Sequence, residues 1–333
     1  MKEKDITGHF TTKGKKIKIS KGGPLGMGKL GFIAPELAQF VYAAITVLMI
    51  LFTWTSIKEP SALLFQRVSF LSGTLALWVV YQIWPCKFMM LCRLLYLLVM
   101  LGSWYPDTYE INQQFGSYDH LFAQWEQSLF GCQPAALFSQ KFSSAVVSEL
   151  MYMGYVSYYL FFIVTVIVVY FRSYQQLERV AYIIFGSFFF CYVIYLVLPV
   201  TGPQYYFCAV GMDKILAGNF PDIGHYFSET TECLKAPGWS DGFFYNVCQL
   251  AHQSGERPTA AFPSSHVAIS TLVMIIVARM RMWKYMLLLA VPYLFLCMAT
   301  VYIQAHYVVD AIVGFFVGIA LFFLFGGMKL RKA

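Results

Sequence analysis

Two short clusters of polar residues stand out in this largely apolar sequence. One covers residues 262–266, with the sequence FPSSH, and the other covers residues 304–310, with the sequence QAHYVVD. Each contains a histidine, whose ring can act as a nucleophile, an acid or a base near neutral pH. Because polar residues at membrane depth are costly and usually functional, we take both clusters as candidate catalytic segments.

The second cluster pairs a histidine with a carboxylate. His306 and Asp310 are four residues apart, so they share a face if both lie on one helix. A carboxylate bonded to one ring nitrogen fixes the tautomer and leaves the other nitrogen free to attack. This spacing predicts a nucleophile, His306, with Asp310 as its orienting partner. A pair that caps a helix end is the structural alternative.

The first cluster supplies complementary groups. Ser264 and Ser265 offer hydroxyls, and the backbone N–H groups of a first helical turn form an anion site. His266 can protonate a leaving oxygen, and Arg257 just upstream can neutralise phosphate charge with two parallel hydrogen bonds. These residue types together indicate phosphoryl chemistry. A helix cap and a packing histidine are the structural alternatives.

The elements that position these clusters are membrane spans. The 333-residue chain is 59% hydrophobic and only 12% charged, and apolar runs of about 20 residues recur, which is the length that crosses a bilayer. We predict an all-α integral membrane protein with about eight transmembrane helices. They lie at roughly 32–57, 62–84, 86–105, 146–171, 178–199, 262–280, 283–304 and 306–326. Arg67 and Arg93 lie near span ends, where long cationic side chains can reach the interface.

Charge distribution predicts the orientation. Residues 1–31 form a basic tail with eight lysines, and the connections between the spans on the same side also carry Lys or Arg. By the positive-inside rule both termini are cytoplasmic, and the loops 106–145 and 200–261 lie on the periplasmic or lumenal face. His266 and His306 are two spans apart, so they reach the same outer surface. The basic tail therefore predicts membrane topology, and we expect no nucleic-acid partner.

The two outer loops carry further features. Leu121, Trp125 and Leu129 recur at helical spacing and predict an amphipathic helix that ends at Gly131, either lying in the membrane interface or packed on the spans. Four of the eight cysteines lie outside in this topology, and they form one or two disulfides or remain free thiols. They are Cys132, Cys208, Cys233 and Cys248.

These motifs resemble the type 2 phosphatidic acid phosphatase superfamily. Residues 263–266 (PSSH) resemble its Pro-Ser-Gly-His block, with Ser265 in place of glycine, and His306 with Asp310 resembles its His-x-x-x-Asp block. Thr300 stands where that block has arginine, and no lysine lies at the expected spacing before Arg257. The branch with the fungal inositol phosphorylceramide synthases is more similar, because it also lacks the arginine and shares the stretches LPVTGP at 198–203 and FGCQP at 130–134.

The resemblance, which covers about 119–322, implies both fold and activity. It implies N-terminal transmembrane helices over 32–105 and a catalytic membrane domain with a six-helix phosphatase-like core over 106–333. It implies His306 as nucleophile, Asp310 as its partner, His266 as general acid, and phosphate binding by Ser264, Ser265 and Arg257. The expected activity is a lipid-phosphate phosphatase that works through a phosphohistidine on a phospholipid or sphingolipid phosphate. The alternative is a phosphodiester headgroup transferase with an alcohol acceptor such as inositol. No metal or organic cofactor is implied.

Three readings from other classes compete with this one. A transporter also places polar residues in the membrane, but the spans show no inverted repeat and the polar residues gather at one surface. A metal enzyme would use the histidines that fall outside, but no paired motif of close-spaced ligands is present. An inactive structural relative would account for Thr300 and Ser265.

Overall fold

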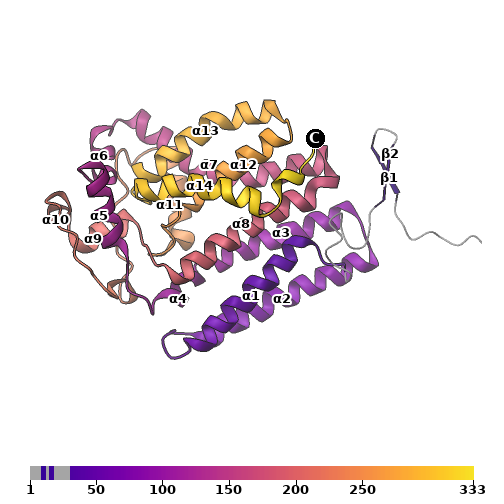
Figure 1. The fold of residues 1–333 in the computed structure, drawn as a ribbon, viewed down its shortest axis with the longest axis horizontal. Coiled ribbons are helices and arrows are strands. Elements are labelled where there is room, and N and C mark those ends of the chain that lie inside the picture. Colours follow the sequence, from indigo (N-terminus) through magenta and orange to yellow (C-terminus); the bar gives the residue numbers. More distant parts are fainter. Residues whose placement is uncertain (1–8, 13–14, 19–30) are drawn as a thin grey trace, which may run out of the picture.

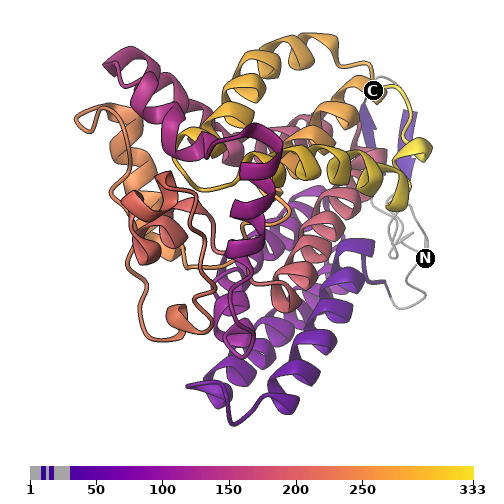
Figure 2. The same ribbon diagram turned by 60° about the vertical axis from the view of Figure 1, so that its left-hand side comes forward.

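The computed structural model describes residues 9–12, 15–18 and 31–333. The rest of the predicted basic tail lies outside the described residues. In the described part of the tail, β1 (His9–Thr12) and β2 (Lys15–Lys18) form a short antiparallel hairpin in which His9 pairs with Lys18. All other regular elements in the described ranges are helices, as Figures 1 and 2 show.

Long apolar helices occupy the positions of the eight predicted spans, which confirms the helical membrane fold. They are α1 (Ala34–Phe52), α2 (Pro60–Ile83), α3 (Lys87–Trp104), α7 (Ala145–Arg172), α8 (Leu177–Val197), α12 (Ser265–Arg279), α13 (Trp283–Tyr302) and α14 (Val308–Leu324). Six of these helices are long and apolar enough to cross a membrane, whereas α12 and α14 are shorter.

The two short helices are the ones that follow the histidine clusters. α12 has 15 residues and α14 has 17, although the predicted spans covered 262–280 and 306–326. At about 1.5 Å per residue, helices of this length cover less than the roughly 30 Å of a bilayer core. The polar segments 262–264 and 303–307 are loops that take up the remaining depth. Both clusters therefore lie at recessed helix ends.

Glycines bring α12 and α14 close together. A Cβ at Gly314 of α14 would lie 2.6 Å from the carbonyl oxygen of Ser264, and one at Gly318 would overlap the backbone of α12 at Ala268. Small residues at such contacts let membrane helices approach closely. α7 packs against α13 and α12, and α8 contacts both α12 and α1, which links α7 and α12–α14 to α1–α3 (Figure 1).

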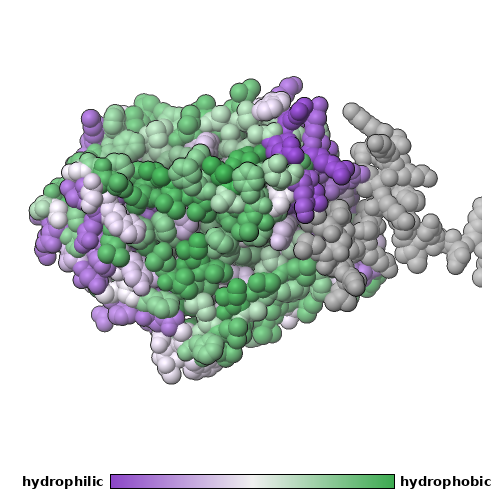
Figure 3. All heavy atoms as spheres, in the orientation of Figure 1, coloured by the Kyte–Doolittle hydropathy of each residue, from purple (hydrophilic) through white to green (hydrophobic). Residues whose placement is uncertain are grey.

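The basic connections gather at one end of the bundle. The Arg179 guanidinium donates to the carbonyl oxygen of Lys329 at 2.8 Å, and the Arg279 guanidinium donates to that of Met328 at 3.0 Å. These contacts join the first turn of α8, the end of α12 and the C-terminal segment. The short helices of the two long loops lie at the opposite end (Figure 1), and an apolar surface separates the polar ends in Figure 3.

Arg67 and Arg93 do not reach the membrane interface, contrary to the prediction. Each is only 1% exposed and forms an ion pair with a buried carboxylate, Arg67 with Asp107 and Arg93 with Glu36. The guanidinium of Arg67 also lies over the Trp104 ring, 4.7 Å from its centroid. A carboxylate within reach makes burial cheaper than snorkelling, so these pairs join α1, α2, α3 and α4 (Asp107–Asn112) inside the protein.

The outer loops form short helices. Besides α4 they are α5 (Asp119–Phe130), α6 (Pro134–Lys141), α9 (Pro203–Val210), α10 (Met212–Leu216) and α11 (Phe243–Gly255). α5 is the predicted amphipathic helix and ends at Gly131 with a φ of 68°. Its carboxylates, Asp119 and Glu126, are buried, while Trp125 and Leu129 are exposed. All eight cysteines are free thiols, which is the second of the two alternatives given for the four outer cysteines.

Candidate active site

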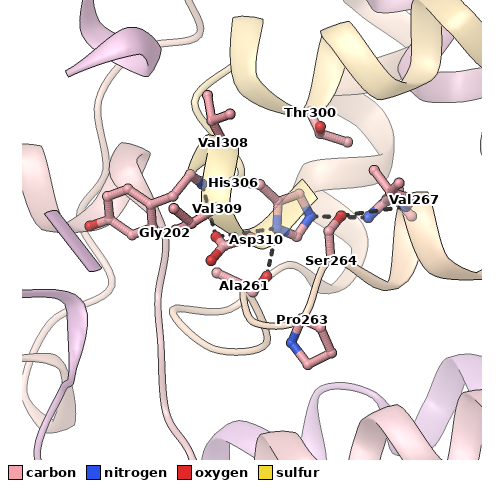
Figure 4. A network of polar contacts seen from close by, with 12 residues as sticks. Gly202, Ala261, Pro263, Ser264, Val267, Thr300, His306, Val308, Val309 and Asp310 are labelled. Atoms are coloured by element: carbon pink, nitrogen blue, oxygen red, sulfur yellow. Dashed lines mark hydrogen bonds and ion pairs between the residues drawn. The ribbon is translucent and has the colours of Figure 1, made fainter. Parts of the chain in front are cut away.

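His306 lies in the loop between α13 and α14 and is 4% exposed. Its Nδ1 lies 2.7 Å from the carbonyl oxygen of Ala261 (Figure 4). Its backbone N–H donates to the carbonyl of Thr300 at 3.0 Å. A carbonyl oxygen only accepts, so Nδ1 carries the proton. The lone pair of the neutral ring is therefore on Nε2.

The protonation state of His306 suits a nucleophile. Burial lowers the pKa of the His306 imidazole to about 4, and the bond to Ala261 and the charge of Glu256 oppose this only in part. Desolvation disfavours the charged form of a histidine, so the ring is neutral at pH 7. Its Nε2 lone pair is then available for attack.

His266 faces this nitrogen from the first turn of α12. Its Nδ1 lies 3.4 Å from Nε2 of His306. The His266 ring stacks on Tyr155, with centroids 4.5 Å apart and an interplanar angle of 22°, and it lies 4.2 Å from the ring of Tyr158. The two histidines, 40 residues apart in sequence, thus meet as the topology predicts. The tyrosines of α7 hold the His266 ring in place.

Asp310 supports the loop rather than bonding the histidine ring. Its Oδ2 lies 3.9 Å from Nδ1 of His306, too far for a hydrogen bond, and accepts the backbone N–H of Tyr307 at 2.8 Å. The backbone carbonyl of Asp310 also accepts the N–H of Ser264 at 3.2 Å. Asp310 therefore caps α14 and links the two clusters, and the carbonyl of Ala261 takes the hydrogen-bond position predicted for its carboxylate.

The two predicted serines lie in different places. Ser264 is fully buried and forms the N-cap of α12, where its Oγ accepts the N–H of Val267 at 3.4 Å. Ser265 lines a pocket together with His266 and His306. Thr300 is fully buried and donates its hydroxyl to the carbonyl of Cys297 at 2.9 Å.

The pocket in front of the histidines also contains Arg257. This side chain is exposed, and its guanidinium donates to the backbone carbonyl of Glu256 at 3.1 Å. Within the described residues it has no carboxylate at ion-pair distance, so its remaining N–H donors are available to a phosphate. The structure thus brings together His306, His266, Ser265 and Arg257, and it leaves Ser264 behind them as a cap.

Sequence reasoning missed a carboxylate in this pocket. Glu256 accepts from the Gln204 amide at 3.1 Å through Oε1, and its Oε2 lies 2.6 Å from Nδ1 of His252. The hydrogen bond to Glu256 raises the pKa of His252 above its ordinary value. The four-residue spacing of His252 and Glu256 is the signal in the sequence from which this pair could have been found. Among the described residues, no group of three or more His, Cys, Asp or Glu side chains is arranged to hold a metal ion.

Buried carboxylates of α5 hold the His306 loop from behind. Asp119 accepts the N–H groups of Thr201 at 2.8 Å and Gly202 at 2.9 Å, and the Tyr307 hydroxyl at 3.1 Å. Glu126 accepts from the backbone N–H groups of Val308 and Val309, the first two residues of α14. The end of the His306 loop that leads into α14 is therefore fixed by hydrogen bonds.

Fold and site together define a helical membrane protein with two facing histidines at recessed helix ends. The chain matches the PAP2 superfamily, which is the type 2 phosphatidic acid phosphatase superfamily, over residues 120–324, or 205 of its 333 residues. It belongs to this superfamily, whose members are generally phosphatases or phosphotransferases. No curated protein and no solved structure gave a significant match.

Proposed function

We propose that this protein cleaves a phosphoester bond of a membrane lipid through a phosphohistidine on His306. The observation that carries the proposal is the tautomer of His306. The Ala261 carbonyl accepts a hydrogen bond from Nδ1–H, which leaves the ring's lone pair on Nε2, the nitrogen that faces His266. A buried neutral imidazole facing a second histidine, beside an unpaired guanidinium, has the groups that phosphoryl transfer requires.

The first step forms the covalent intermediate. The Nε2 lone pair of His306 attacks phosphorus, and the bond from phosphorus to the leaving lipid oxygen breaks. That oxygen takes a proton from His266, which first takes up the proton from solvent or from the bound phosphate. Because attacking and leaving atoms are roughly in line, the 3.4 Å between the two rings must widen when a substrate binds. Arg257 and the Ser265 hydroxyl bind the phosphate oxygens.

The second step regenerates the enzyme. Water or an alcohol attacks phosphorus and gives its proton to His266, and the bond from phosphorus to Nε2 breaks, returning the lone pair to His306. The proton stays on Nδ1 of His306, hydrogen-bonded to the Ala261 carbonyl, throughout. Water as acceptor makes the protein a lipid phosphatase, which is the first candidate because hydrolysis is common in the superfamily.

The charge of the pocket favours transfer to an alcohol as the second candidate. Thr300 replaces an arginine, and the Glu256 carboxylate lines the pocket beside Arg257. A phosphomonoester dianion needs more positive charge than a diester monoanion, because electrostatic repulsion scales with charge. This balance supports a diester headgroup substrate, as in the inositol phosphorylceramide synthase branch.

A lipid panel distinguishes the two candidates. Purified protein is incubated with phosphatidic acid and with phosphodiester lipids, with and without an alcohol acceptor, and free phosphate and lipid products are followed together. Phosphate released by the wild type but not by His306→Ala supports the phosphatase. A new headgroup lipid without free phosphate supports the transferase. Absence of both activities in folded protein contradicts the proposal.

We also propose that both termini face the cytoplasm and that the histidines face the periplasm or lumen. The proposal is supported by the basic residues gathered at one end of the bundle, including Arg179 and Arg279. Single cysteines placed in the α7–α8 turn and at exposed Asp241, in a chain without other reactive thiols, test it in intact vesicles. A membrane-impermeant reagent should label only the cysteine at position 241 from the outer side.

A further inference from the structure

A second group of reactive side chains lies beside the catalytic pocket. Cys233, His252 and Glu256 line one cavity of about 250 Å³, which is formed by residues of α7, α9, α11 and the segment 233–236. Since a water molecule takes up about 30 Å³, this space holds a small organic molecule. The two steps proposed for His306 use neither Cys233 nor His252.

The three side chains form a continuous chain of polar contacts. Nδ1 of His252 lies 2.6 Å from Oε2 of Glu256. An ionised carboxylate only accepts, so Nδ1 carries the proton and the lone pair of the neutral ring is on Nε2. The Sγ atom of Cys233 lies 3.8 Å from that nitrogen. This is the order of nucleophile, base and orienting carboxylate that activates a side chain for covalent catalysis.

Neighbouring residues hold the histidine and its carboxylate in place. The ring of Tyr205 lies nearly parallel to the His252 ring, with an interplanar angle of 18°. The Gln204 amide donates to Oε1 of Glu256 at 3.1 Å. The backbone N–H of Leu234 donates to the carbonyl of Gln204 at 2.9 Å, which ties the segment that carries the thiol to the first turn of α9.

The thiol of Cys233 needs such a base. Burial raises the pKa of this thiol above its ordinary value, and the charge of Glu256 adds to the effect. A thiol that keeps its proton is a weak nucleophile until a base removes the proton during the attack. The hydrogen bond to Glu256 raises the pKa of His252, which makes its neutral ring a stronger base. The same carboxylate stabilises the imidazolium that forms.

The lining of the cavity favours an uncharged acyl group over a phosphate. The Glu256 carboxylate would repel a phosphate anion, whereas the carbonyl group of a carboxylic ester carries no net charge. Lys235 in the same lining supplies a cation for the negative charge that develops on the carbonyl oxygen during attack. A short hydrocarbon chain can pack against the apolar and aromatic part of the lining, which consists of Tyr152, Leu234, Ala236, Tyr245 and Ile303.

We propose that Cys233 is a second nucleophile, which takes the acyl group of a carboxylic ester with His252 as base and Glu256 as its orienting partner. Sγ attacks the carbonyl carbon while its proton passes to Nε2 of His252, and the ester C–O bond breaks as this proton passes to the leaving oxygen. Water then attacks the thioester carbonyl and gives a proton to His252. The C–S bond breaks and the proton returns to Sγ. This acyl hydrolysis goes beyond the proposed function and does not use His306.

Turnover of a short-chain ester is the first test. Reduced protein in detergent is given p-nitrophenyl acetate at about pH 8.5, where more of His252 is neutral than at pH 7. Cys233→Ala and His252→Ala should each lower kcat/KM by about a hundredfold or more. Glu256→Gln should lower it similarly, because the new amide can donate to Nδ1 and move the ring proton to Nε2. Equal rates in wild type and Cys233→Ala overturn the proposal.

The control for this test is another thiol of the same outer loop. Cys208 lies on α9 and is not part of the cavity lining, so Cys208→Ser should keep the wild-type rate. A thermal melt of each variant in detergent separates loss of chemistry from loss of fold. An equal fall of the rate in Cys208→Ser and Cys233→Ala would overturn the assignment of the nucleophile.

Mapping the acyl group gives an answer that needs no variant. Wild type is quenched in acid within the first turnover, digested and analysed by mass spectrometry. The proposal predicts an acetyl group on Cys233 that hydroxylamine removes. Cys248, which lines the same cavity one helical turn before His252, is the internal control. Ester turnover without an acetyl group on Cys233, equal acetylation of Cys248, or a disulfide at Cys233 in protein isolated without reductant overturns the inference.

Discussion

Replacing Glu126 by glutamine should remove a specific part of the pH dependence of stability. The Glu126 side chain is fully buried on α5 and accepts from the backbone N–H groups that begin α14. Burial raises its pKa from 4.5 to about 7, and the two backbone hydrogen bonds oppose this only in part. Glutamine keeps a carbonyl oxygen for the same N–H groups but cannot ionise.

The sign follows from proton binding. Between pH 4.5 and 7 the folded protein keeps the Glu126 proton while the unfolded chain loses it, so stability falls as pH rises through this window. At about 1.4 kcal/mol per pKa unit the whole effect is roughly 3 kcal/mol, of which about 2 kcal/mol is lost between pH 5.5 and pH 8.5. The pH dependence of Glu126→Gln should be smaller by this amount.

The assay is unfolding in detergent micelles at the two pH values for wild type, Glu126→Gln and the control Glu229→Gln. The control is exposed and should behave as wild type. Glu126→Ala, which also loses the cap of α14, should be destabilised at both pH values by about 1 kcal/mol or more. Identical pH dependence in wild type and Glu126→Gln would refute the reasoning that burial holds this carboxyl neutral.

Three further predictions concern the site and its support. Gly202→Ala should lose most activity and unfold earlier in a thermal melt, because Gly202 has a φ of 92° and its Cβ would overlap the Ala305 carbonyl; wild-type behaviour would contradict the tight packing of this loop. Arg93→Ala should cost about 3–5 kcal/mol by leaving Glu36 buried without its partner. Adding Glu36→Leu should recover part of this loss, and strictly additive losses would contradict the pairing. The acid limb of the pH–rate profile should lie near the pKa of His306, about 4, because the neutral ring attacks; an acid limb near 6.5 would contradict a buried nucleophile.

The membrane spans were the most predictable part of the molecule. The predicted spans 146–171 and 283–304 correspond to α7 (Ala145–Arg172) and α13 (Trp283–Tyr302) within two residues. The thickness of the bilayer sets the length of each apolar run in the sequence, and lysines and arginines mark the ends of these runs. The ends of α12 and α14 were predicted less well. The predicted spans there include loop residues that form hydrogen bonds across the site.

The meeting of the two histidines was predictable from topology, but their hydrogen bonds were not. The pairing of His306 with Asp310 assumed one helix through both residues, whereas α14 begins only at Val308. His306 therefore does not share a helix face with Asp310, and its Nδ1 bonds the Ala261 carbonyl. A backbone carbonyl leaves no trace in residue types, so sequence reasoning could not find it.

Contacts made by the outer loops were also beyond sequence reasoning. The periodicity of 119–130 predicted a helix, but its pattern did not show that Glu126 would face the protein and Trp125 the surroundings. The surroundings of a membrane protein are apolar, so the buried face of such a helix can be the polar one. Glu256 enters the pocket only because the long loop 200–261 folds back over it, bringing Gln204 to its carboxylate.

The central claim is the covalent bond between phosphorus and Nε2 of His306. Wild type, His306→Ala and Glu229→Gln are mixed with lipids carrying a labelled phosphate, quenched within one turnover, digested and mapped by mass spectrometry. The account predicts an acid-labile, base-stable phosphoryl group on His306 in wild type and in Glu229→Gln, and none in His306→Ala. Lipid turnover without label on this histidine, or equal labelling of His306→Ala, would contradict it.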